Sequence, residues 1–132
     1  MIEKRRITLV RINNNVNDSV NILIQEFGRS LGLFTQRDKE SSCFRIFIDL
    51  LKSHEDKISS QELAFRSGLT RGTVVHHLNR LIEEGLVVVE KNRYFLCADN
   101  LKNLVANIER DSNRIIANMK KIAEKVDEEL GI

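Results

Sequence analysis

Apolar residues recur every three or four positions over most of the chain, and this spacing predicts a largely helical protein. The predicted helices cover residues 17–33, 41–52, 60–66, 70–84 and 100–130. Two β-branched and aromatic runs, residues 86–90 and 93–98, flank Lys91-Asn92 and predict a β-hairpin with a tight turn. Residues 4–12 are β-branched and basic, so they predict either a short strand or an extended arm.

Polar residues and glycines mark the ends of these helices. Ser59 and Glu62 have the spacing of a capping box, in which two side chains satisfy free amides at a helix start. Thr70 can cap the next helix, and Gly85 fits the position after its end that requires a left-handed backbone. The absence of proline from the sequence and its six glycines favour long helices with short connections.

The order of these elements indicates a fold. Two helices joined by a short turn around Gly68 and followed by a β-hairpin form the winged helix-turn-helix arrangement. The sequence therefore predicts a mainly α fold with a small β-hairpin wing and a long C-terminal dimerisation helix. Its predicted parts are an N-terminal arm and helix that pack on the dimer helix (1–40), the winged helix-turn-helix domain (41–98) and the dimerisation helix (99–132).

Residues 70–84 separate apolar from polar side chains on a helical wheel. Val74, Leu78 and Leu81 form an apolar stripe, and polar residues lie on the opposite side. Short side chains with hydrogen-bonding groups suit the major groove of DNA, because they permit close approach to base edges. The candidates for reading bases are Arg71, Thr73, His76 and Asn79. The candidates for contacting phosphates are Thr70, Arg80, Lys91 and Arg93, the last two at the tip of the predicted wing.

The distribution of charge favours a nucleic-acid partner, although the formal net charge of +2 is too small to indicate one. Residues 63–82 contain three arginines and no acid, whereas residues 123–132 contain one lysine and four acids. The positive charge is therefore local, and it is concentrated around the predicted helix 70–84.

The segment LTRGTVVHHLNRLIEEGLV, residues 69–87, resembles the recognition helix of ArsR-type winged-helix repressors. The resemblance rests on His76, His77, Leu78, Leu81, Gly85, Leu86 and Val87. MarR-like regulators share the leucine and the Gly-Leu-Val part. The resemblance implies a DNA-binding transcriptional regulator, usually dimeric. Val75 stands where these repressors carry a serine, so one of their polar contacts is not carried over. Metal-sensing members carry cysteine pairs on the preceding helix, where residues 59–68 contain none.

Other chemistries find little support in the sequence. His76 and His77 are adjacent, so on a helix they point about 100° apart and are not expected to chelate one metal ion. Cys43 and Cys97 are expected to be small buried apolar residues. No catalytic or phosphate-binding motif appears, so neither an enzyme nor a cofactor is expected. No signal peptide and no membrane-spanning apolar run are found, which favours the cytoplasm.

The last predicted helix carries a heptad pattern, which is typical of helices that pair in a coiled coil. The repeat consists of Leu101, Val105, Ile108, Ser112, Ile115, Met119, Ile122 and Val126, of which the seven apolar members are the dimerisation candidates. About 30 residues of helix are roughly 45 Å long, more than a domain of this size covers, so the pattern favours a homodimer. Two-fold symmetry would then place two recognition helices about 34 Å apart on an inverted repeat in double-stranded DNA.

Two other functions are compatible with these patterns. A winged helix can serve as a protein–protein interaction or architectural module without reading DNA sequence, and the modest net charge and acidic C-terminus favour this alternative. A ligand-responsive sensor would carry a pocket between the long helix and the winged domain, and it would also be compatible with DNA binding. The sequence identifies no small-molecule effector.

Overall fold

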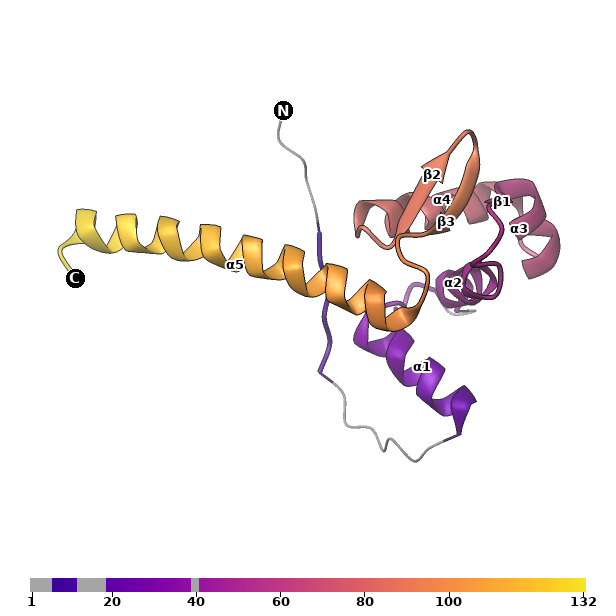
Figure 1. Cartoon of the computed structure of the whole chain (residues 1–132), viewed down its shortest axis with the longest axis horizontal. Helices are drawn as coiled ribbons and strands as arrows, with labels where there is room; N and C mark the ends of the chain where they lie inside the picture. Colours follow the sequence, from indigo (N-terminus) through magenta and orange to yellow (C-terminus); the bar gives the residue numbers. More distant parts are fainter. Residues whose placement is uncertain (1–5, 12–18, 39–40) are drawn as a thin grey trace.

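The computed structural model describes residues 6–11, 19–38 and 41–132. Its elements are α1 (Val20–Ser30), α2 (Ser42–Lys52), β1 (Ile58–Ser59), α3 (Ser60–Ser67), α4 (Arg71–Glu83), β2 (Val87–Glu90), β3 (Arg93–Leu96) and α5 (Leu101–Leu130). Figure 1 shows α2, α3, α4 and the strands gathered in one body, from which α5 extends. The predicted helices are therefore present with similar bounds, and the predicted start of the first helix at residue 17 lies outside the described residues.

The helices α2, α3 and α4 pack around a single apolar core. Phe47 and Leu50 of α2, Leu63 of α3 and Leu78 of α4 are all almost fully buried in it. Each lies on the apolar face of its helix, so burial of these faces removes apolar surface from water and holds the three helices together.

A three-stranded antiparallel sheet lies beside these helices in the order β1-β3-β2. Lys91 and Asn92 connect β2 to β3 with φ angles of 51° and 63°, as in a two-residue type I′ turn. The predicted hairpin with a tight turn is thus confirmed, and it forms the wing. The strand β1 is absent from the sequence prediction, because two residues are too few to show an alternating pattern. Its Ile58 is buried and pairs with Tyr94 of β3.

A short turn joins α3 to α4. Helix α3 begins where Oγ of Ser59 accepts a 3.1 Å hydrogen bond from the amide of Glu62, the N-terminal half of the predicted capping box. It ends before Gly68, whose φ of 70° turns the chain in the left-handed region that favours glycine. Three residues, 68–70, therefore separate the two helices.

Both ends of α4 are held by local hydrogen bonds. Oγ1 of Thr70 accepts from the amide of Thr73 at 3.2 Å. At the other end Gly85 has a φ of 77°, and the amide of Leu86 donates to the carbonyl of Leu81 at 2.9 Å, as in a Schellman motif. The predicted capping roles of Thr70 and Gly85 are therefore confirmed.

The N-terminal arm and α1 lie outside the three-helix core. Residues 6–11 form no regular strand, and the rest of the run predicted as a strand or an arm lies outside the described residues. Helix α1 packs on α2, where the rings of Phe27 and Phe47 stack with centroids 6.4 Å apart. In the arm, Ile7 borders a small cavity next to Ile108 of α5. Thus the arm reaches α5, whereas the stacking contact of α1 is with α2.

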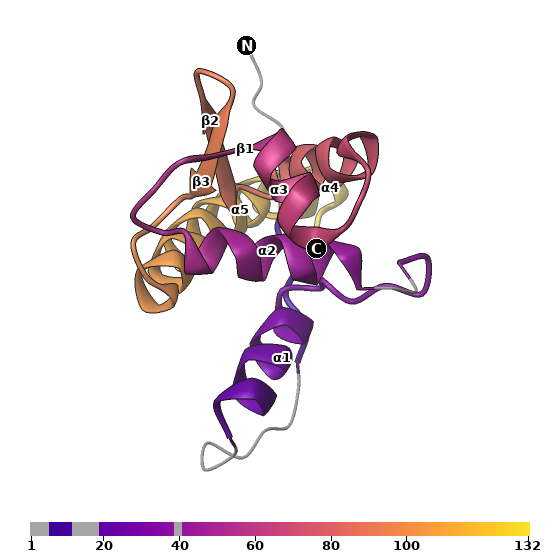
Figure 2. The same ribbon diagram turned by 90° about the vertical axis from the view of Figure 1, so that its right-hand side faces the viewer.

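Helix α5 is part of the core at its start and leaves it further on. The side chain of Asn100 caps the helix by accepting a 2.8 Å hydrogen bond from the amide of Asn103. Leu104 and Ile108 are buried in the core, whereas every residue from 113 to 132 is exposed. Figure 1 shows this second half projecting away from the winged body, and in Figure 2 α5 lies behind that body.

These elements define a winged helix-turn-helix fold: mainly helical, with a small antiparallel sheet and a long C-terminal helix. The fold class predicted from the sequence is confirmed. Within the described ranges, no helix combines the length and the apolar character that crossing a bilayer requires.

Candidate nucleic-acid interface

The face of α4 that points away from the core carries short or hydrogen-bonding side chains. Gly72, His76 and Asn79 are exposed, while Val74 and Leu78 on the opposite side are fully buried. The predicted separation of the helix into two faces is therefore confirmed. A Cβ atom added at Gly72 would meet no atom within 4 Å, so the surface is open there. Such a face can approach the edges of base pairs in a major groove.

Two threonines at the start of α4 share one hydrogen-bonding arrangement. Oγ1 of Thr70 donates to Oγ1 of Thr73 at 2.8 Å and also accepts from the amide of Thr73. The hydroxyl of Thr70 is thus used within the helix start. The hydroxyl hydrogen of Thr73 is left to donate to another group. Of the two threonines, Thr73 is therefore better placed to contact a ligand.

Two of the predicted DNA-contacting arginines are anchored to other elements. Nε of Arg71 donates to Oγ of Ser60 at 3.3 Å, which ties α4 to the start of α3. Nη1 of Arg93 donates to the carbonyl of Lys57 at 3.0 Å, which ties the wing to the residue before β1. A guanidinium group has five N–H donors, so each arginine keeps donors for an external partner. Both side chains are thus preoriented at the surface.

Arg80 has a stronger internal role than the sequence indicates. Its Nη2 donates to the carbonyl of Gly32 at 2.9 Å, and its Nε lies 3.7 Å from Oε1 of Glu84. The Glu84 side chain is only 6% exposed, and burial raises the pKa of this carboxyl while the Arg80 charge opposes the rise. Arg80 therefore balances a buried carboxylate as well as lying beside the exposed face.

The two adjacent histidines of α4 occupy different environments. The ring of His76 is exposed, whereas His77 is half-buried, and their centroids are 5.5 Å apart at 63°. Burial lowers the pKa of His77, and the Coulombic effects of His76 and Arg80 act in the same direction against that of Asp38. Burial thus favours the neutral form of the His77 ring. Its buried Nδ1 has no hydrogen-bond partner among the described residues.

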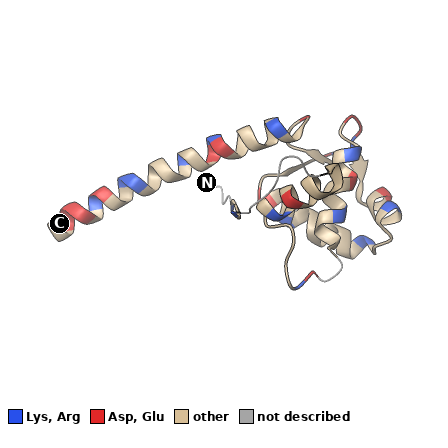
Figure 3. Ribbon diagram, turned by 90° about the horizontal axis from the view of Figure 1, so that it is seen from below, with Lys and Arg blue, Asp and Glu red and all other residues tan. Residues whose placement is uncertain are grey.

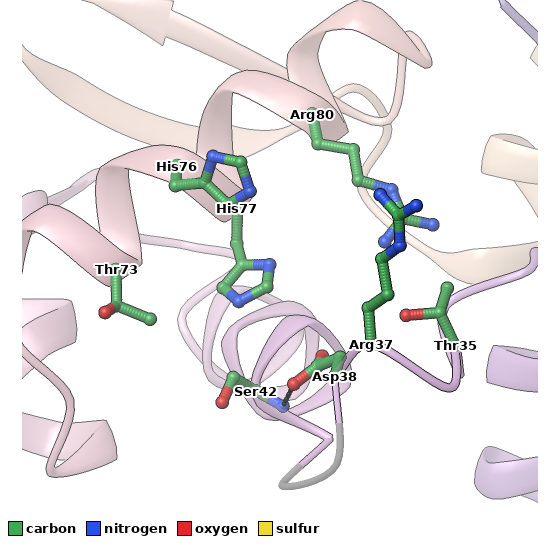
Figure 4. Close-up of a pocket in the computed structure, with 8 residues that line it drawn as sticks. All are labelled: Thr35, Arg37, Asp38, Ser42, Thr73, His76, His77 and Arg80. Atoms are coloured by element: carbon green, nitrogen blue, oxygen red, sulfur yellow. Dashed lines mark hydrogen bonds between the residues drawn. The ribbon is translucent and has the colours of Figure 1, made fainter.

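A groove runs along one flank of α4, and we call it the α4 groove. Its volume is about 550 Å³. It is lined by Thr73, His76, His77 and Arg80 of α4 and by Arg37 and Asp38 of the loop before α2, as Figure 4 shows. The sequence does not reveal Arg37 and Asp38 as part of the site, because a loop without periodicity gives no sign of which helix it will face.

Asp38 fixes the position of this loop. Its two carboxylate oxygens accept hydrogen bonds of 2.8 Å from the amides of Ser42 and Cys43, at the start of α2. Burial tends to raise the pKa of Asp38, but these amide hydrogen bonds outweigh it and hold the pKa below its usual value. Asp38 therefore stays ionised and attaches the loop to the first turn of α2.

The wing places a cation beyond the end of the sheet. Lys91 is exposed at the turn, and no described residue forms a hydrogen bond or ion pair with it. Next to it, Glu90 is paired with Lys57 at 2.9 Å. Figure 3 shows basic and acidic residues interspersed over the winged body and along α5. The interface is thus defined by the positions of single free cations and not by a broad positive surface.

The remaining chemistry-bearing groups do not gather at this interface. Cys43 is fully buried, and burial raises the pKa of its thiol to about 11; Cys97 is half-buried. In the part of the chain that the structure describes, no three His, Cys, Asp or Glu side chains are grouped to hold a metal ion. The cavity between α5 and the winged body, bordered by Cys97 and Asn107, is small, with a volume of about 200 Å³.

Comparison with known proteins gives a family match for part of the chain. Residues 46–94, which run from α2 into β3, match the MarR family. The chain is similar to the crystal structure of transcriptional regulator PA3341, with 19% identity and a TM-score of 0.43, over 76% of this chain and 90% of that chain. No curated protein matches the chain. The family match agrees with the MarR-like part of the resemblance and does not confirm the ArsR-type assignment.

Proposed function

We propose that this protein is a homodimeric regulator of transcription that binds double-stranded DNA in a sequence-specific manner, and not an enzyme. The exposed face of α4 carries the proposal, because His76 and Asn79 present hydrogen-bonding groups there on a helix capped at both ends. The family match over residues 46–94 supports the same function. A cytoplasmic location remains the prediction made from the sequence.

Helix α4 would enter the major groove with its exposed face towards the base edges. The side-chain amide of Asn79 carries one acceptor and two donors, which suits the paired donor and acceptor of adenine. His76 and Thr73 add single hydrogen bonds, and Arg71 can reach a base with the donors that Ser60 does not use.

Phosphate contacts would flank this reading face. Lys91 at the wing tip has no hydrogen bond or ion pair with a described residue, and Arg93 keeps unused donors beside it. The sequence also predicts that Thr70 and Arg80 contact phosphates. Because their side chains are bonded within the protein, we assign both chiefly to positioning α4.

Dimerisation would use the exposed apolar residues on the second half of α5, which we call the α5 stripe. The stripe consists of Ile115, Ile116, Met119, Ile122 and Val126, which are 36–65% exposed. Continuous apolar exposure over several turns is unfavourable in water and is typical of an interface. The earlier heptad positions differ: Ile108 is buried in the core and Leu101 packs against it, so these two candidates belong to the protomer's own fold. Val105 is 45% exposed and remains a dimerisation candidate.

The experiment that tests this function is selection from random duplex DNA, followed by sequencing, at two salt concentrations. Enrichment of an inverted repeat with half-sites one helical turn apart is the expected result. On the selected site, Asn79→Ala should lose about 5- to 150-fold in affinity, corresponding to about 1–3 kcal/mol. Asn103→Ala, on an exposed part of α5, is the matched control and should bind normally. Binding without any enriched sequence would contradict the proposal.

An interaction module is the second candidate, and one observation favours it. Phe65 on α3 is 89% exposed, and Val88 and Val89 on the wing are also exposed. Apolar groups in water at these positions suit a protein partner. If this candidate is correct, wild-type protein shows no DNA binding at low salt, whereas Phe65→Ala abolishes capture of a partner protein.

A further inference from the structure

Residues 35–38, which precede the winged helix-turn-helix, place the positively charged side chain of Arg37 beside α4. Arg37 lines the α4 groove and is exposed. Within the described residues its side chain has no hydrogen bond or ion pair, whereas Arg71, Arg80 and Arg93 are each bonded to another element. Among the described residues, Arg37 is therefore the arginine of this surface whose guanidinium group has no internal partner.

The arrangement around Arg37 suits an anion. Figure 4 shows its side chain extending towards that of Arg80, and both line the same groove. Two guanidinium groups that line one groove repel each other, and an anion between them relieves this repulsion. The groove thus offers two guanidinium groups, one from the loop before α2 and one from α4.

The negative charges of the acidic groups near the groove are already balanced by other contacts. The carboxylate of Asp38 accepts the amides of Ser42 and Cys43, where the positive end of the α2 dipole balances it. Glu84 is buried and faces Arg80. Neither carboxylate is therefore directed at a ligand in the groove.

We propose that the α4 groove holds a backbone phosphate of the bound DNA, with Arg37 as its main ligand. The inference rests on the proposed function, because a helix in the major groove has a sugar-phosphate strand along each flank. It extends the DNA contact to a loop that precedes the winged domain. The contact would help to fix how deeply and at what angle α4 enters the groove.

The salt dependence of DNA binding tests this contact. Each neutralised phosphate contributes about 0.9 to the slope of log K against log salt concentration. Arg37→Ala should therefore reduce the slope by about 1 and weaken binding to selected and random DNA by the same factor. Arg37→Lys keeps the charge and should keep the slope. The control is Lys52→Ala, at the opposite end of α2 from the groove.

The outcomes separate this inference from the proposed function. If wild-type protein binds DNA and Arg37→Ala has the slope of Lys52→Ala, the phosphate contact is wrong while the proposed function stands. If wild-type protein binds no DNA, the proposed function itself fails. Titration with inorganic phosphate, followed through the NMR signals of His76 and His77, tests a free anion as the source. Arg37-dependent shifts together with an unchanged DNA slope would assign the groove to a free anion and overturn the DNA contact.

The charges along α5 are unevenly distributed. Its last turns contain Asp127, Glu128 and Glu129, and the last turn has no basic residue. The carbonyl end of a helix carries partial negative charge, so acids at this end are unfavourable for an isolated helix. This arrangement becomes favourable if positive groups from another molecule lie alongside.

The positive groups that fit lie earlier on the same helix. Arg110 and Arg114 are exposed and precede the α5 stripe, while the acids follow it. In a parallel pair, acids would lie beside acids. In an antiparallel pair that places Ile115 against Val126 of the partner subunit, Arg114 lies level with the acidic end of the other helix. The two helix dipoles are then antiparallel, which is also favourable.

We infer that the α5 stripe pairs antiparallel with a second copy of this chain, which deepens the proposed dimer. Disulfide cross-linking of Ile115→Cys and Val126→Cys tests it, with Cys97→Ser in both proteins to remove the half-buried thiol. An antiparallel pair gives a cross-linked dimer only when the two variants are mixed. Cross-linking within each variant alone would indicate a parallel pair and overturn the inference. Monomers by light scattering at all concentrations would instead refute the dimer.

Discussion

Nη2 of Arg80 donates a 2.9 Å hydrogen bond to the backbone carbonyl of Gly32, joining α4 to the segment just after α1. The same side chain faces the buried carboxylate of Glu84 one turn along the helix. An arginine that the sequence nominates for DNA therefore also connects two parts of the protein that are distant in sequence.

Arg80→Ala should reduce the stability of the protein as well as any DNA affinity. The substitution leaves a buried carboxylate without its cation and a carbonyl without its donor, each costing about 1–3 kcal/mol. Urea unfolding should therefore show a lower free energy of unfolding. In a double-mutant cycle with Glu84→Gln, part of this loss should be recovered, because the neutral amide needs no counter-charge. Unchanged stability with weaker DNA binding would mean that Arg80 is only a phosphate contact.

Gly72→Ala should raise the stability of the protein and lower its affinity for DNA. The added Cβ meets no atom within 4 Å, and alanine favours a helix over glycine by up to about 1 kcal/mol, so the unfolding free energy should rise. The methyl group projects from the exposed face of α4, so affinity for the selected DNA should fall. The matched control is Gly68→Ala, where a φ of 70° makes alanine unfavourable by about 1–2 kcal/mol. Thermal unfolding and DNA titration of both variants test the pair.

Asp38→Asn should lower stability in a pH-dependent manner. Although burial raises the pKa of Asp38, the amides of Cys43 and Ser42 bring it below the usual value, so folding favours the ionised carboxylate. This contribution, about 1 kcal/mol for a helix cap, is present above about pH 4 and is lost as the pH falls through the lowered pKa. The stability difference from wild type should therefore shrink in acid. Asp56→Asn, in an exposed loop, is the control, and an equal loss there would remove the special role of Asp38.

Met119→Asp combined with Ile122→Asp should abolish dimerisation without unfolding the winged body. Both positions are more than 60% exposed in the protomer, so the charges meet water in the monomer and a facing helix only in the dimer. Light scattering should give the mass of one chain, while the circular dichroism of the core helices persists. Lys121→Ala, between the two positions, should remain dimeric. A double variant that is still dimeric would place the interface elsewhere.

Interactions between residues that are close in the sequence account for much of what the sequence predicts correctly. Thr70 and Gly85 act on neighbours within a few residues, so the bounds of α4 follow from the sequence alone. Strand β1 depends on pairing with β3, more than thirty residues away, and is therefore missed. For the same reason the sequence does not reveal that Arg80 reaches Gly32.

The candidate site shows the same division between local and distant effects. Helical periodicity places His76 and Asn79 on the exposed face of α4, as the structure does. Periodicity cannot say which loop lies beside that face, so Arg37 is missed. The heptad spacing also continues from Ile108 through Ser112 to Ile115, although Ile108 is in the core and Ile115 is exposed.

That change from core to solvent occurs within one uninterrupted helix. Because Ile108 is fixed in the winged body and Ile115 lies on the α5 stripe, the six helical residues between them act as a rigid spacer. Each residue inserted there would turn the partner by about 100° and move it by about 1.5 Å. In a dimer joined through this helix, the distance between the half-sites in DNA would thus be set by a residue count in the protein.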